Sequence, residues 1–405
     1  MATWLLPDNM ADILPQQMRV LEKMRRTCLD LFASHGFEQV EPPMIEFVSS
    51  LLTGSGSDLD NNTFKFMDQA NGRMVGLRAD ITPQIARIDA HILNSTGVSR
   101  LCYAATCLHA RPLHPLASRE PFVAGAELFG CSGEEADRYM IRLAVKTLRL
   151  LGVEKVHVDI GHTAIVRALL AADRALNEEE LHAILRALRM KDPTALESAA
   201  ATLKPATHAA LSALLTHFGD ASVIDELEKL LPASGAVQKA LAEARELGKT
   251  CGADEVSYDF CDVHGYQYLT GATFSVNIQQ YAQAVLRGGR YDGVGLAFGR
   301  PRPACGFTVY LRELSAVLNA SEKDIRPEAV LADATVTDKD YRRDVEKLRA
   351  CGKIVNSLLP GERPLAAAEA EVLDARQGQP VGCAAHQDSL SQVTPSGRVS
   401  ATVTV

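Results

Sequence analysis

The stretch Arg287-Gly288-Gly289-Arg290-Tyr291-Asp292-Gly293 carries a pair of glycines with an arginine on each side. Glycine has no Cβ atom, so the backbone at this pair can come close to a ligand. The two guanidinium groups are fork-shaped donors for phosphate or carboxylate. Two interpretations follow: a site for an anionic group, or a tight turn between strands with solvent-exposed arginines.

Two further stretches place polar side chains where packing alone does not require them. In Leu77-Arg78-Ala79-Asp80-Ile81-Thr82-Pro83-Gln84, Asp80 and Thr82 are two residues apart, so in an extended chain both face one side and can receive an ammonium group. The alternative is that both cap a helix that starts at Pro83. In Gly125-Ala126-Glu127-Leu128-Phe129-Gly130, Glu127 is an acid in an apolar strand, which either lines a site or points to solvent.

The chain around these stretches alternates helical and extended patterns. Apolar residues recur at helical spacing from Pro15 to His35, and Gly36 supplies the stop. Asn71-Gly72 separates two short extended runs, which predicts a hairpin. An Ala-, Leu- and Glu-rich segment at about 163–250 is interpreted as an inserted helical module. The main strands expected elsewhere are 101–106, 122–129, 155–162, 256–260, 272–277 and 306–310.

The C-terminal segment is predicted to be a separate domain. Residues 1–325 form the expected core, and residues 326–405 a small α/β domain after Arg326-Pro327. Within this domain we expect a helix from Asp340 to Leu359. Strand-like runs lie near 329–334, 380–384 and 398–405. The predicted fold class is α+β.

Composition and charge exclude several classes of protein. The 405 residues are 47% hydrophobic and 23% charged, as in ordinary globular proteins. A net charge of −8 provides no positive field for a nucleic-acid backbone, so we expect no nucleic-acid partner. The first nine residues lack a secretion signal, and no apolar stretch approaches the roughly 18 residues of a membrane span. We therefore expect a cytoplasmic protein without membrane contact.

The sequence predicts neither a metal nor a cofactor. Its nine cysteines are scattered without a Cys-x-x-Cys pair and are expected to be free thiols. His157 and His162 are five residues apart on an expected strand, so they cannot face one metal ion from the same side. A phosphate-binding Gly-x-x-x-x-Gly-Lys loop and a dinucleotide fingerprint are both missing.

The order of the motifs resembles that of histidyl-tRNA synthetase over roughly residues 5–318. The resemblance implies a class II aminoacyl-tRNA synthetase core, in which helices flank an antiparallel sheet and a helical insertion separates the second and third class-defining motifs. It also implies a dimer. The matching motifs are Glu41-Pro42-Pro43, Leu77-Arg78-x-Asp80-x-Thr82, Glu127-Leu128-Phe129-Gly130, Gly288-Gly289-Arg290-Tyr291-Asp292-Gly293 and Gly306-Phe307.

The departures from that family fall where ATP chemistry needs cations. Leu108 and Ala110 stand where the second motif offers an arginine and a glutamate. A shifted register makes Arg111 the phosphate arginine, but Leu113 then replaces the glutamate. Two further family arginines are replaced, by His264 and Glu313. Because each lost donor typically lowers the rate roughly 100- to 1000-fold, we expect no adenylation. The C-terminal segment is also too short for the usual anticodon-binding domain.

A synthetase fold without ATP chemistry and tRNA docking is similar to the regulatory-subunit family of ATP phosphoribosyltransferase. That resemblance implies a non-catalytic chain that joins a short-form catalytic subunit, as a self-dimer within a hetero-octamer, in the first step of histidine biosynthesis. It also implies feedback inhibition by L-histidine, because a ligand shifts an assembly through its differential affinity for two states. The alternatives are a divergent active histidyl-tRNA synthetase and a stand-alone amino-acid sensor.

The resemblance also implies a set of site residues, with no catalytic residue and no metal ligand among them. The histidine pocket of the synthetase corresponds here to Asp80, Thr82, Glu127 and Tyr268. Its closing loop corresponds to Gly288, Gly289 and Arg290, and we add Arg111 to the ligand-binding set.

Overall fold

The computed structural model describes residues 5–54, 57–115, 117–279, 281–318, 329–360 and 371–372. Internal contacts divide the chain into two units, Met1–Asn319 and Ala320–Val405. The strand-like runs expected near 380–384 and 398–405 lie outside the described residues. No described helix has the length and apolar character that a membrane span requires.

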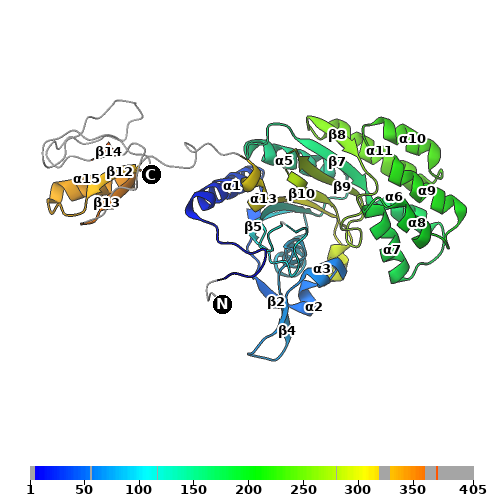
Figure 1. Cartoon of the computed structure of the whole chain (residues 1–405), viewed down its shortest axis with the longest axis horizontal. Coiled ribbons are helices and arrows are strands. Elements are labelled where there is room, and N and C mark those ends of the chain that lie inside the picture. Colours follow the sequence, from blue (N-terminus) through cyan, green and yellow to red (C-terminus); the bar gives the residue numbers. More distant parts are fainter. Residues whose placement is uncertain are drawn as a thin grey trace. The chain divides into compact units, whose positions relative to one another are not determined.

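An eight-stranded sheet forms the centre of the first unit (Figure 1). Its six central strands are antiparallel neighbours, and a parallel strand closes each edge. Each main strand expected from the sequence is present to within two residues at either end. In spatial order the strands are β1 (Glu38–Gln39), β5 (Ser99–Thr106), β6 (Phe122–Phe129), β11 (Ala304–Tyr310), β10 (Tyr281–Arg290), β9 (Ala272–Ile278), β7 (His157–His162) and β8 (Glu255–Tyr258).

Two long helices cover one face of this sheet. Helix α1 (Pro15–Ser34) starts at a proline, and Gly36 follows its end with a φ of 78°. Its buried Phe32 meets Phe307 of β11 edge-on, with ring centroids 5.8 Å apart. Helix α5 (Glu134–Leu150) buries Met140 and other apolar residues in the same core. The helix predicted from the amphipathic pattern is thus confirmed. Its apolar side packs on the sheet, which stabilises the helix.

The other face of the sheet carries a smaller core and a second sheet. The second sheet consists of β2 (Ile45–Phe47), β4 (Met74–Leu77) and β3 (Lys65–Met67). Gly72 has a φ of 71° in the connection between β3 and β4, so the predicted hairpin is confirmed. The short elements near this face are α2 (Val48–Leu51), α3 (Ser57–Asn62), α4 (Thr82–Arg87), the π-helical turn Ile88–Leu93 and α12 (Val294–Ala297). Helix α13 (Leu311–Val317) lies instead on the face covered by α1, where Leu311 and Leu314 join the large core.

Helices fill the segment from residue 163 to residue 250, as the sequence predicts. Figure 1 shows them gathered beside β7 and β8 at one end of the sheet. They are α6 (Thr163–Ala171), α7 (Glu178–Arg189), α8 (Pro193–Ala199), α9 (Pro205–Thr216), α10 (Ser222–Leu230) and α11 (Gly235–Thr250).

The second unit contains a parallel strand–helix–strand arrangement. Strand β12 (Ala329–Asp333) pairs with β13 (Ile354–Leu358) and with β14 (Glu371–Val372). The helix predicted from Asp340 to Leu359 is wrong in its second half, because α15 (Lys339–Ala350) ends before Gly352. Gly352 has a φ of 78°, which stops the helix and allows the chain to continue as β13.

The expectation of free thiols holds for seven cysteines: Cys28, Cys102, Cys107, Cys131, Cys251, Cys261 and Cys305. It is wrong for Cys351, which is disulfide-bonded.

Candidate functional site

A cavity of about 820 Å³ lies over the central strands of the large sheet. The strand register forms its floor in two rows. In the first row Glu127 lies opposite Gly306, which lies opposite Gly289 and then Thr273. Two residues along, Thr308 of β11, Arg287 of β10 and Ser275 of β9 form the second row. Because side chains alternate along a strand, these residues share one face.

Glycines in the floor make room for the acidic group. A Cβ atom on Gly306 would stand 1.6 Å from Oε2 of Glu127, and one on Gly289 would stand 2.7 Å from the carbonyl oxygen of Ala272. Gly288 and Gly289 lie inside β10, so the alternative of a tight turn between strands is wrong. A close approach of neighbouring groups, and not a turn, requires glycine here.

Glu127 points into the cavity and not to solvent. Its side chain is buried, and its carboxyl group accepts hydrogen bonds from the hydroxyls of Thr82 (2.9 Å), Tyr103 (3.2 Å) and Tyr291. Burial raises the pKa of Glu127 from 4.5 to about 8, although these hydroxyl donors oppose the shift. Burial therefore favours the protonated form of Glu127.

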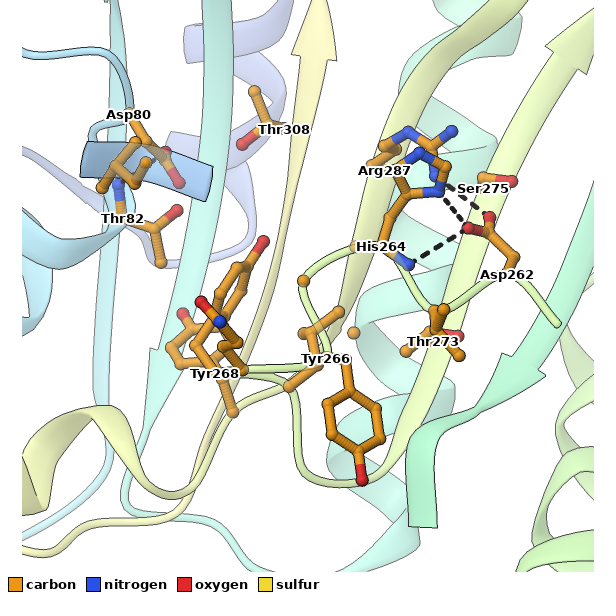
Figure 2. A pocket seen from close by; sticks show the side chains of 18 of the residues that line it. Asp80, Thr82, Asp262, His264, Tyr266, Tyr268, Thr273, Ser275, Arg287 and Thr308 are labelled. Carbon is orange, nitrogen blue, oxygen red and sulfur yellow. Dashed lines mark hydrogen bonds and ion pairs between the residues drawn. The ribbon is translucent and has the colours of Figure 1, made fainter. Parts of the chain in front are cut away.

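Asp80 and Thr82 lie at the start of α4, but they do not both cap it as the alternative interpretation expected. Ile81 holds the N-cap position without a side-chain cap bond, Thr82 is the first residue of the helix, and the carboxyl Oδ1 of Asp80 accepts a hydrogen bond from the backbone N–H of Thr82 (3.1 Å). Both residues also line the cavity, and Figure 2 shows them beside each other on one side of it. Burial raises the pKa of Asp80, while the N–H of Thr82 and the nearby His109 act against this rise.

The segment from Asp262 to Leu269 forms another wall. Asp262 accepts hydrogen bonds from the ring of His264 and from Nη1 of Arg287 (3.0 Å), as the dashed lines in Figure 2 show. Although burial opposes it, the hydrogen bond from His264 and the charge of Arg287 lower the pKa of Asp262. Tyr268 projects from the same segment into the cavity, and burial raises the pKa of its hydroxyl.

The helical insertion holds this wall in place. Arg167 of α6 donates to the carbonyl oxygens of Tyr266 and Leu269 (3.0 Å to the latter), and its guanidinium lies 4.2 Å from the ring centroid of Tyr266. Gln267 is hydrogen-bonded to His182 of α7 at 2.8 Å. Helices α6 and α7 of the insertion therefore contact the wall of the cavity directly.

The structure brings together most of the residues expected from the sequence. Those that line the cavity are Asp80, Thr82, Arg111, Glu127, Tyr268, Gly288 and Gly289. Arg290 is not among them. Its guanidinium lies on the opposite face of β10, within 3.1 Å of the carboxyl groups of Asp137 and Asp292. The position of Arg290 is structural, and Arg287 is the arginine of this strand whose guanidinium lies at the cavity.

Sequence reasoning left several lining residues out of the candidate set. Arg287 and Arg290 are three residues apart on one strand, so only one of them can face the cavity. The sequence spacing could therefore have indicated that one of the two arginines lies outside the site. Thr308 and Ser275 lie beside Arg287 because of the strand register, which the sequence alone does not give. The omitted residues with polar side chains at the cavity include His109, Ser275, Arg287, Tyr291, Thr308 and Tyr310.

The position of the third-motif arginine is occupied by a buried acid. Glu313 lies in the first turn of α13, and its Oε2 atom is buried without a hydrogen-bond partner among the described residues. Burial raises the pKa of this carboxyl group. The nearby Arg312 donates instead to the backbone oxygens of Glu120 (3.0 Å) and Ala11 (2.7 Å). No group of three or more His, Cys, Asp or Glu in the described part of the chain is arranged to hold a metal ion.

Comparisons with known proteins show which family the chain resembles. A family model of histidyl-tRNA synthetase matches residues 9–314. The ATP phosphoribosyltransferase regulatory subunits of Burkholderia mallei and Paraburkholderia phytofirmans are each 45% identical over 361 residues, which cover 89% of this chain and 93% of each relative.

Two solved structures have the same fold. One is described as an ATP phosphoribosyltransferase regulatory subunit/histidyl-tRNA synthetase from Bacillus halodurans. It is 26% identical with a TM-score of 0.76, and the match covers 90% of this chain and 95% of that one. The other, a histidyl-tRNA synthetase from Nostoc sp. PCC 7120, is 16% identical with a TM-score of 0.69, and the match covers 90% of this chain and 88% of that one. At 16% identity this second likeness shows the fold alone.

Proposed function

Because this chain belongs to the histidyl-tRNA synthetase-like family of ATP phosphoribosyltransferase regulatory subunits, we propose that its cavity binds L-histidine and that the occupied chain inhibits a catalytic subunit. The observation that carries the regulatory role is the 45% identity to regulatory subunits over 89% of the chain. The chain is the non-catalytic member of such a complex.

The absence of cations from the old ATP positions supports a non-catalytic role. Leu108 and Ala110 offer no charged donor or acceptor, and Glu313 would repel a triphosphate. Arg111 lines the cavity, but its side chain is exposed and it stands alone at that edge of the site. A fold that keeps an amino-acid cavity and has lost these groups is suited to sensing a ligand.

The charges in the cavity favour an amino acid with a cationic group. Glu127 is buried and Asp80 is half-buried, and Thr82 is hydrogen-bonded to both acids. An ammonium group there would favour the ionised form of both carboxyls, which burial otherwise disfavours. Arg287 stands on a different strand of the floor, where it can interact with a carboxylate. Tyr268 and Tyr310 supply aromatic surface for an imidazole ring.

The family membership supports the proposed assembly. We expect a short-form catalytic subunit of ATP phosphoribosyltransferase as the partner, a self-dimer of this chain within a hetero-octamer, and a cytoplasmic complex. Histidine would then act by binding one state of this assembly better than another. The required coupling is typically about 1–3 kcal/mol, which corresponds to a 5- to 150-fold change in affinity.

Reconstitution with the catalytic subunit of the same genome tests this function. The phosphoribosyltransferase rate should rise when this chain is added and fall as L-histidine is added. Calorimetry on the isolated chain should show histidine binding that is weakened by Asp80→Asn and left intact by Asp137→Asn, since Asp137 does not line the cavity. An unchanged rate with and without this chain would refute the regulatory role. Histidine-dependent pyrophosphate exchange from ATP would instead favour a divergent synthetase.

A further inference from the structure

Arg287, on the floor of the cavity, already binds a carboxyl group of the chain itself. Its Nη1 atom donates to Oδ2 of Asp262 at 3.0 Å, and within the described part of the chain this is the only hydrogen bond of its guanidinium. A guanidinium has five N–H donors, so Arg287 keeps most of them for another group. Arg290, on the same strand, is bound instead by Asp137, Asp292 and two backbone carbonyl oxygens.

The guanidinium of Arg287 lies across the cavity from Asp80. Figure 2 shows Asp80 on one side and the pair of Asp262 and Arg287 on the other. Burial raises the pKa of the hydroxyls of Tyr268 and Tyr310, the charge of Asp80 adds to this rise, and the charge of Arg287 opposes it. Both tyrosines therefore lie within reach of both charges. A carboxylate on a ligand that lies along these rings can reach Arg287.

The ion pair between Asp262 and Arg287 is suited to exchange. Its two side chains are 26% and 32% exposed, and partly exposed ion pairs contribute little to stability. Oδ1 of Asp262 has a separate partner, the ring of His264 two residues further along the same segment. A foreign carboxylate that took the place of Oδ2 would break one hydrogen bond and leave Asp262 paired with His264.

The segment 262–269 connects this ion pair with the helical insertion. At its start, Asp262 binds Arg287 of β10. Nearer its end, Arg167 of α6 donates to two of its carbonyl oxygens, and Gln267 is hydrogen-bonded to α7. Release of Asp262 would free the start of the segment while the insertion still holds its end, so the change would reach α6 and α7.

We propose that Asp262 is an internal competitor of the ligand: the carboxylate of the bound amino acid takes the place of Asp262 on Arg287 and releases the segment 262–269 from the floor. Only a ligand with a carboxylate makes this exchange, so Asp262 and Arg287 determine which ligands change the contact with the insertion. This inference rests on the proposed function, because it takes L-histidine as the ligand.

Calorimetry with L-histidine and histidinol, which lacks the carboxylate, tests the competition. Asp262→Asn keeps the shape of the side chain and removes its charge. It should tighten L-histidine binding about fivefold and leave histidinol within about twofold. Asp259→Asn is the matched control for the loss of a negative charge, because Asp259 also lies at the cavity but pairs with Lys191 (2.9 Å). It should change L-histidine binding by less than about twofold.

The arginine provides the second half of a double-mutant cycle. Arg287→Gln should weaken L-histidine about tenfold, because a charged donor to its carboxylate is lost, and leave histidinol within about twofold. The double variant Asp262→Asn with Arg287→Gln should bind L-histidine no better than Arg287→Gln alone, since Asp262 then has nothing to compete for.

Hydrogen–deuterium exchange measures the release of the segment. In the wild-type chain, backbone amides of residues 262–265 should exchange faster with saturating L-histidine than with saturating histidinol. Saturation with both ligands separates this effect from the protection that any occupant of the cavity provides. Asp262→Asn without ligand should already exchange faster than the wild-type chain at the same amides.

Other outcomes overturn the proposal. Weaker binding of L-histidine by Asp262→Asn would show that Asp262 orients Arg287 for the ligand. A gain in affinity that persists in the double variant would assign the effect to charge acting through space. Equal exchange with both ligands would show that the carboxylate joins the ion pair without displacing Asp262. Failure of the wild-type chain to bind L-histidine, alone or with the catalytic subunit, would instead refute the proposed function itself.

Discussion

Gly306→Ala tests the close contact on which the floor of the cavity depends. The added Cβ atom would stand 1.6 Å from Oε2 of Glu127, whereas real Cβ contacts essentially never fall below 3.0 Å. The carboxyl group would therefore have to retreat by at least the difference of 1.4 Å. A shift of this size breaks its hydrogen bonds with Tyr291 and Tyr103, since neither ring can follow in a packed core.

The energetic cost follows from these contacts. Two lost hydrogen bonds cost about 1 kcal/mol each, and overpacking adds about 1–3 kcal/mol. We expect the free energy of unfolding to fall by roughly 3–5 kcal/mol, with a decrease in Tm of about 10 °C. Histidine binding should fall at least tenfold, because Glu127 leaves its place at the floor.

Thermal unfolding and calorimetric titration with L-histidine measure the two effects. Gly235→Ala is the matched control: its Cβ atom would meet nothing within 4 Å at the first position of α11, so stability should change by about 0.5 kcal/mol or less. The double variant Gly306→Ala with Glu127→Ala should regain part of the stability lost in Gly306→Ala, since the clashing group is gone. A Gly306→Ala protein with wild-type Tm and affinity would refute the reasoning.

Three further predictions concern the groups around the cavity. The pKa of Glu127 is raised to about 8, so the stability that the protonated group contributes is complete below pH 4.5 and is lost as the pH rises through 8. Glu127→Gln should reduce this loss of stability in thermal melts between pH 5 and 9, and an unchanged dependence of Tm on pH would contradict the assignment. Tyr266→Phe should keep histidine affinity within about twofold, because it retains the ring beneath Arg167. Tyr266→Leu lacks this ring, so it should lose roughly 1 kcal/mol of stability and bind histidine several-fold more weakly in calorimetry. Arg290→Ala leaves half-buried Asp137 without its partner and should cost up to about 3–5 kcal/mol in urea unfolding. A loss of histidine affinity greater than about threefold would show that Arg290 also serves the cavity.

Local patterns were sufficient for most of the secondary structure. The helical spacing that predicts α1 and the glycine turn that predicts the hairpin of β3 and β4 depend on residues adjacent in the chain. The same logic missed the strand at Ile354–Leu358, because the apolar residues there also fit the preceding helical pattern. Gly352 was the local signal that ends α15.

The candidate site was predicted in part. Asp80, Thr82 and Glu127 line the cavity, and all three were in the set that the motif resemblance implies. Arg290 was included and Arg287 was not, because the resemblance places Gly288, Gly289 and Arg290 in the closing loop, although both arginines flank the glycine pair. Their three-residue spacing places them on opposite faces of β10, and only the position of the cavity decides which arginine serves it.

The sequence by itself determined the family, the order of the elements and the loss of the ATP-binding cations, since these are properties of residue identity along the chain. The tertiary structure alone decided where the buried acid Glu127 points and which arginine of β10 faces the cavity. Strand β6 is buried on both faces from Val123 to Phe129, so it shows no alternation from which the direction of Glu127 can be derived. The carboxyl group of Glu127 meets the hydroxyls of Thr82, Tyr103 and Tyr291, which come from separate parts of the chain. Contacts of that kind exist only after the sheet has assembled.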